Sequence, residues 1–160
     1  VAEEGVSRSD PACRRLMPGG ACYFQIDEAD VERVIAHPGT MSGSDGLPHD
    51  RHPHPRLSGA FPRVFARYWR DRKLFTLEQA VHKMTGLAAA NVGIADRGVI
   101  RPGAFADLVL FDPEVVADRA TFESPFETSV GIATVWVNGV PVWQGGSATG
   151  ARPGEGIRRP

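Results

Sequence analysis

The chain has 160 residues, with 42% apolar and 23% charged side chains and a formal net charge of −1. This balance is that of a globular protein and excludes the positive field expected of a nucleic-acid or anionic-membrane partner. No apolar run approaches the roughly 18–20 residues of a membrane helix, so we expect no membrane partner. The two cysteines, Cys13 and Cys22, form no zinc or redox motif, and we expect a cytoplasmic protein without a disulfide framework.

The first third of the chain alternates between irregular stretches and short elements. Residues 1–19 show no periodicity and are expected to be irregular. Asp27 is the expected N-cap of a helix over 28–37, which has an i, i+3, i+4 apolar stripe. We expect a short buried strand over 40–44 and, after a turn, a proline-rich and histidine-rich loop over 48–56.

The middle of the chain is predicted to be helical. An apolar face predicts a helix over 60–73, and the arginines on its other side are interpreted as a solvated face. Thr76 and Gln79 have the spacing of a capping box at the start of a helix over 77–84. An alanine-rich segment, 87–92, is expected to form one more short helix.

The last third is predicted to be β-rich. A strand is expected over 107–112, and Asn138-Gly139 is the favoured type I′ turn of a hairpin over 133–143. Helices therefore dominate before residue 93 and strands after 97, which indicates two parts. We divide the chain into an irregular segment, a helical part, a strand-rich part and a disordered tail, at 1–19, 20–93, 94–145 and 146–160.

The tetrapeptide Gly43-Ser44-Asp45-Gly46 contains a candidate catalytic carboxylate. Its glycines allow the backbone to approach a ligand closely. If the preceding strand belongs to a barrel, Asp45 lies at the strand end where such barrels hold their active sites, and it could accept a proton from an activated water. The competing interpretation is an ordinary Asx-turn.

Three histidines and an arginine follow within ten residues. His49, His52 and His54 are close in sequence, but the intervening prolines and their spacing do not favour a complete local metal site. One of them lining an active site is the better hypothesis. The guanidinium of Arg56 has the planar fork that matches a carboxylate, although from the residue alone a surface arginine is the more common case.

The run from Gly43 to Leu57, GSDGLPHDRHPHPRL, resembles the signature of N-acyl-D-amino-acid deacylases, also called D-aminoacylases, of the amidohydrolase superfamily. The resemblance continues through 61–65, 77–85, 97–109 and 135–142. The last two motifs are less specific, because they occur across the superfamily. Ser42 departs from the family, which has an apolar residue there.

The resemblance implies an α/β fold: the C-terminal fragment of a metal-dependent (β/α)8 amidohydrolase barrel. Residues 20–93 would supply the last barrel strand and the following helices, and 94–145 part of a small β-sandwich domain. Such barrels need about 250 residues. We therefore expect a C-terminal portion that is inactive alone and whose partner is the N-terminal half of the barrel.

The resemblance also implies zinc-dependent cleavage of the small-molecule substrate, an N-acyl-D-amino acid, to a D-amino acid and a carboxylate. Asp45 would be the general base and a weak ligand of a second metal, and most zinc ligands would lie in the N-terminal portion. Arg56 would bind the substrate carboxylate and His49 would line the substrate site, while His52 and His54 match motif positions without individual roles. The alternatives are an amidohydrolase acting on cyclic amides and a non-catalytic remnant domain.

Overall fold

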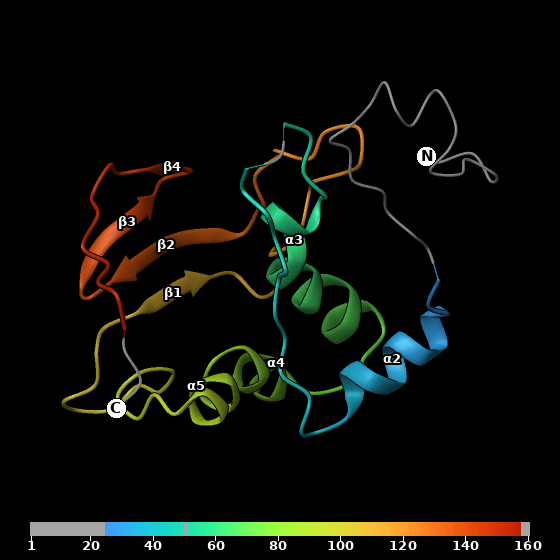
Figure 1. The fold of residues 1–160 in the computed structure, drawn as a ribbon, viewed down its shortest axis with the longest axis horizontal. Helices are drawn as coiled ribbons and strands as arrows, with labels where there is room; N and C mark the ends of the chain where they lie inside the picture. The colour runs from blue at the N-terminus through green and yellow to red at the C-terminus, as the bar shows by residue number, and fades with distance from the viewer. Residues whose placement is uncertain (1–24, 50, 158–160) are drawn as a thin grey trace, which may run out of the picture.

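The computed structural model describes residues 25–49 and 51–157. The predicted irregular segment 1–19 and both cysteines lie outside these residues. The helices gather on one side and an antiparallel sheet lies on the other (Figure 1). In the described part of the chain, no helix is long and apolar enough to cross a membrane.

The predicted helix starts are confirmed by their caps. Helix α2 (Glu28–Ala36) begins where the Asp27 carboxylate accepts the N–H of Ala29 at 2.8 Å. Helix α4 (Leu77–Met84) begins with both bonds of a capping box, since Thr76 Oγ1 accepts the N–H of Gln79 and the N–H of Thr76 binds Gln79 Oε1. Helix α5 (Gly86–Val92) follows directly.

The predicted helix 60–73 starts earlier and changes type. Helix α3 (Arg56–Arg63) continues into η1 (Val64–Asp71), a π-helix. The change follows Pro62, which has no N–H to donate to the carbonyl of Ser58 four residues earlier. The hydroxyl of Ser129 donates to that carbonyl instead, at 2.9 Å. The helix is thereby joined to a residue 71 positions away in sequence.

The arginines of α3 and η1 do not form a merely solvated face. Each binds a particular partner, while the side chains of Arg63, Arg67 and Arg72 stay 39–52% exposed. On α2, Glu28 binds Arg67 and Glu32 binds Arg72. Arg70 binds the carbonyls of Pro113 and Val116. Arg63 binds Asp118. Helix α2 has no buried residue, and two of these ion pairs connect it to Arg67 of η1 and to Arg72, the C-cap of η1.

The strands form one antiparallel sheet in the order β1-β2-β3-β4. The first three are β1 (Leu108–Phe111), β2 (Ile132–Val137) and β3 (Val140–Gln144). Asn138 and Gly139 have φ angles of 50° and 78°, which a type I′ turn requires and which confirm the predicted hairpin. The sheet meets the helices where Phe111 contacts Phe65 of η1, with ring centroids 4.7 Å apart.

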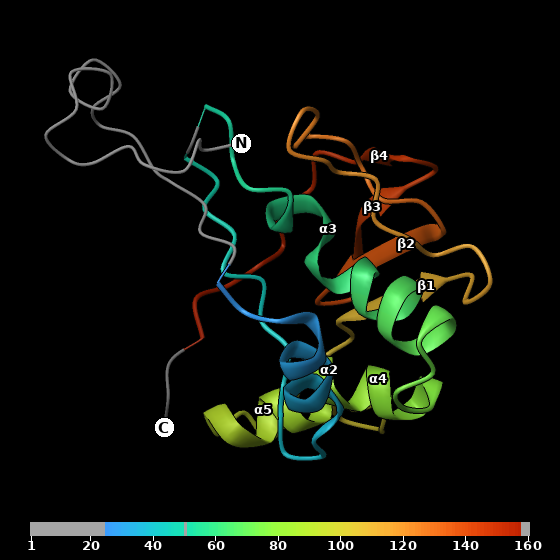
Figure 2. The same ribbon diagram turned by 90° about the vertical axis from the view of Figure 1, so that its right-hand side faces the viewer.

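The sheet extends beyond residue 145, into the stretch predicted to be a disordered tail. Strand β4 (Ser147–Ala148) pairs with β3 through Trp143 and Gln144. Figure 2 shows β4 beside β3 at the far edge of the sheet from β1. The tail prediction is therefore wrong at these two residues. The division of the chain into domains stays a prediction.

The predicted strand over 40–44 does not form. These residues run as irregular chain between α2 and α3, and among the described residues the backbone bond that connects them to another element is that of the Ser42 N–H to the Lys83 carbonyl, at 3.3 Å. A parallel strand has no hydrogen bonds within itself, and the described residues place no strand beside this segment. Ser42 Oγ is buried without a hydrogen-bond partner among those residues.

Large apolar side chains are uncovered on both parts of the structure. Ile100 is 90% exposed, and Val109 and Leu110 of the edge strand β1 are more than half exposed. An unpaired strand edge with apolar side chains favours association with other chains.

We therefore expect the chain, expressed alone, to self-associate or to stay loosely packed. Light scattering after size-exclusion chromatography should show oligomers, and a fluorescent probe of apolar surface should bind. Replacing Val109 and Leu110 by threonine and lysine should raise the monomer fraction. A monomer with a cooperative calorimetric transition would contradict this expectation.

Candidate active site

The two main candidate residues form an ion pair. Arg56, the first residue of α3, places Nη2 3.0 Å from Asp45 Oδ2. The Asp45 side chain is 80% exposed and that of Arg56 39%. The fold thus brings the predicted base and the predicted carboxylate-binding residue together.

The backbone around Asp45 is bent toward α3. Asp45 has a φ of 48°, in the left-handed region that aspartate tolerates better than most residues. A Cβ on Gly46 would lie 2.9 Å from Leu57 Cα, so only glycine allows this approach of the turn to the helix. The glycine after Asp45 therefore has a steric role in placing the carboxylate beside Arg56.

The loop before α3 is packed against residues 118–123. Pro53 is fully buried. The ring of His54 contacts that of Phe122 edge to face with centroids 5.0 Å apart, and His52 Nε2 is hydrogen-bonded to the Phe122 carbonyl. The sequence analysis missed this second segment, since no local pattern connects residues 70 positions apart.

His54 supports the start of α3 and is held in its neutral form. Its Nδ1 accepts the N–H of Arg56 at 3.0 Å. Burial lowers the pKa of His54, and the positive charge of Arg56 lowers it further. A protonated ring could not accept this bond, so geometry and electrostatics favour the same protonation state.

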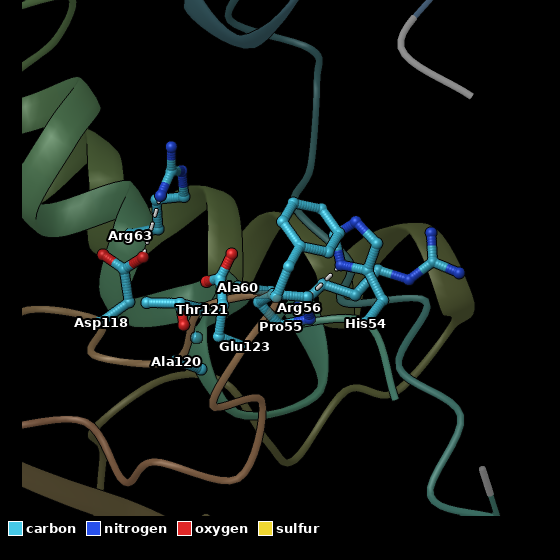
Figure 3. Close-up of a pocket in the computed structure, with 11 residues that line it drawn as sticks. His54, Pro55, Arg56, Ala60, Arg63, Asp118, Ala120, Thr121 and Glu123 are labelled. Atoms are coloured by element: carbon cyan, nitrogen blue, oxygen red, sulfur yellow. Dashed lines mark hydrogen bonds and ion pairs between the residues drawn. The ribbon is translucent and has the colours of Figure 1, made fainter. Parts of the chain in front are cut away.

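A cavity of about 430 Å³ lies between α3 and the 118–123 segment. Figure 3 shows His54 at one end of it and the ion pair of Arg63 with Asp118 at the other, with Thr121 and Glu123 between. Arg56 lines the same cavity. The cavity thus adjoins the Asp45–Arg56 pair.

The described residues include no group of three His, Cys, Asp or Glu side chains placed to hold a metal. His49 is exposed, and His52 and His54 are turned to Phe122. Asp45 offers a carboxylate that is 80% exposed. These residues can add a ligand to a zinc site but cannot form one, because zinc needs three or four convergent ligands.

Comparison with known proteins identifies the class to which this architecture belongs. The sequence model of the amidohydrolase family matches residues 7–143 of this chain. The chain belongs to the amidohydrolase family.

Its relatives with more than 50% identity include a D-aminoacylase and deacylases of N-acyl-D-aspartate and N-acyl-D-glutamate. A D-aminoacylase from Alcaligenes xylosoxydans xylosoxydans is 56% identical over 99% of the chain and 33% of its own length, and an N-acyl-D-aspartate deacylase from the same organism is 52% identical over 97% and 31%. The chain spans about a third of the length of these curated relatives.

Among solved structures, the N-acyl-D-glutamate deacylase of Bordetella bronchiseptica, in complex with zinc and a phosphonate inhibitor, superposes with a TM-score of 0.81 at 57% identity. The match covers 86% of this chain and 29% of that one. Matches of this kind are to the C-terminal portion of barrel enzymes, so the predicted fold class is confirmed.

The lowered pKa of His54 gives a direct test of the loop geometry. In the folded protein the imidazole should titrate below its ordinary value of 6.5. As the pH falls, His54 therefore binds a proton in the unfolded state before it does so in the folded state. The free energy of unfolding should decrease as the pH drops from about 6.5 toward the folded pKa of His54. Proton NMR of the protein with labelled histidines should show this midpoint, assigned by its loss in His54→Asn.

Arg56→Met serves as the matched variant, since removing the nearby charge should raise the His54 midpoint only in part while burial persists. A His54 midpoint at or above its ordinary value of 6.5 would contradict the packing described here.

Proposed function

We propose that the protein to which this chain belongs is a zinc-dependent deacylase of N-acyl-D-amino acids, as its relatives are. The observation that supports this most is the contact of Asp45 with Arg56, which joins an accessible carboxylate to a carboxylate-binding group. Its substrate would be a small N-acyl-D-amino acid, and its products a D-amino acid and a free carboxylic acid.

The ion pair suggests how substrate binding prepares the base. Without substrate, Asp45 neutralises Arg56. The α-carboxylate of a substrate would compete for the guanidinium, whose Nε has no hydrogen-bond partner among the described residues. Asp45 would then be free to accept the proton of the attacking water and to deliver it to the leaving nitrogen.

Zinc, when bound, would polarise the attacking water and the scissile carbonyl. The described residues hold no group of three potential ligands, and Asp45 is the ligand that we assign to them. We propose that the remaining ligands lie elsewhere in the protein and that Asp45 contacts a second, weakly held metal. The location proposed for the protein is the cytoplasm, where a protein without a disulfide framework is typically found.

The isolated chain should therefore neither hydrolyse N-acyl-D-amino acids nor retain zinc. After dialysis against buffer with a weak chelator, we expect well under one zinc per chain by atomic emission, while the complete protein keeps its metal. Stoichiometric zinc in the dialysed isolated chain would contradict this ligand assignment.

In the complete protein, Asp45→Asn should lower kcat by about 10²–10⁴-fold, because the amide keeps the shape of the carboxylate but accepts no proton. Steady-state hydrolysis of an N-acetyl-D-amino acid measures this. The thermal midpoint should hardly change, since exposed ion pairs contribute about 0–1 kcal/mol. Near-normal kcat in this variant would return Asp45 to the role of an Asx-turn residue.

Arg56→Lys should chiefly raise KM, because lysine keeps the charge but loses the planar fork. An ester-capped substrate has no free carboxylate and should be nearly indifferent to the change. Equal weakening of the free-acid and ester substrates would refute the carboxylate-binding role. Cyclic amides are included in the assay, since their hydrolysis in place of the linear amides would contradict the proposed substrate class.

A further inference from the structure

Lys83 of α4 is an unusual residue in this fold because its charged side chain is buried, with 3% of the residue exposed. Lysine is rarely buried without compensating partners, since its ammonium ion loses hydration there. Accordingly, burial lowers the pKa of Lys83. The sequence pattern contains a weak signal of this burial, because Lys83 lies three residues after fully buried Ala80 on the same helix face.

The partners of the Lys83 ammonium are backbone carbonyls. Nζ donates to the carbonyl of His37, the C-cap of α2, and to that of Thr40, at 3.1 Å in the second case. The C-terminal end of a helix has unpaired carbonyls and a partial negative charge, which suit a cation. The ring of Phe75 lies beneath the ammonium, with its centroid 5.8 Å away.

The backbone of Lys83 contacts the same segment. Its carbonyl accepts the N–H of Ser42, at 3.3 Å. One residue of α4 therefore binds residues 37, 40 and 42, on the approach to Asp45. The other end of the segment is limited by the contact of Gly46 with Leu57. Asp45 lies between these two attachments.

We propose that Lys83 is a positioning residue for Asp45. It fixes the start of the irregular segment 37–46, so that the carboxylate of Asp45 is presented in one place relative to Arg56 and the cavity. The inference rests on the proposed function, because it assigns Lys83 an effect on the reaction in which Asp45 accepts the proton. Lys83 itself touches neither Asp45 nor a substrate.

A buried apolar residue would stabilise α4 at a lower desolvation cost, which makes a purely structural role a poor explanation of the ammonium. A displacement of about 1 Å at a reacting group can cost on the order of 10²-fold in rate. Loss of the contacts that Lys83 makes with residues 37, 40 and 42 should therefore have a measurable effect on the rate.

The sequence offers a matched control, since Lys73 and Lys83 are its only lysines and Lys73 is exposed. In the complete protein with its metal, Lys83→Met should lower kcat by about 10-fold or more while KM changes less. Lys73→Met should leave both unchanged. Lys83→Arg, which keeps N–H donors and charge, should restore part of kcat. If Lys83→Met does not fold, Lys83→Gln takes its place in this comparison.

A double-mutant cycle separates positioning from general stability. If Lys83 acts through Asp45, Lys83→Met should have little further effect on kcat in an Asp45→Asn background. A merely structural role predicts the same fold-loss in both backgrounds, and that result would overturn the proposal.

Hydrogen exchange tests the same idea without activity. The amides of residues 39–46 should exchange faster in Lys83→Met than in Lys73→Met, and the amides of the sheet should not. If the complete wild-type protein has no deacylase activity, only the proposed function is refuted. If the amides of residues 39–46 exchange equally fast in Lys83→Met and Lys73→Met, the role of Lys83 is refuted whatever the activity.

Discussion

Within the described residues, Asp45 is held in place by contacts at the two ends of its segment. These residues form no ladder of hydrogen bonds between α2 and α3, so their course in this portion of the protein depends on α4 at one end and on α3 at the other. At the first end the contacts are polar, through Lys83, and at the second they are steric, between Gly46 and Leu57. The geometry of the candidate site therefore depends on how α3 and α4 are oriented relative to one another.

The orientation of α3 depends in turn on the strand-rich part of the chain. The 118–123 segment packs on the loop that precedes α3, and Arg70, near the end of η1, binds the carbonyls of Pro113 and Val116. Val116 is itself fully buried and leaves no room for a side chain at Gly131. The helical part and the sheet are thus structurally interdependent, even though sequence patterns separate them at about residue 93.

Local signals in the sequence predict the local elements well. Asp27, the capping box at Thr76 and the Asn138-Gly139 turn all form as expected, because each depends on residues within a few positions. The strand over 40–44 does not form because a strand depends on neighbours from elsewhere. Contacts distant in sequence, such as Lys83 with His37 or His54 with Phe122, have no local signature. The proximity of Asp45 and Arg56 was expected only through the family resemblance.

The contact between Ser129 and the carbonyl four residues before Pro62 links two positions far apart in sequence. With proline at 62, the Ser58 carbonyl has lost its helical donor and depends on the Ser129 hydroxyl. A residue with a backbone N–H at 62 would supply that donor and make the hydroxyl dispensable. Positions 62 and 129 should therefore co-vary among related sequences, with serine or threonine at 129 whenever proline occupies 62, and with free choice at 129 otherwise.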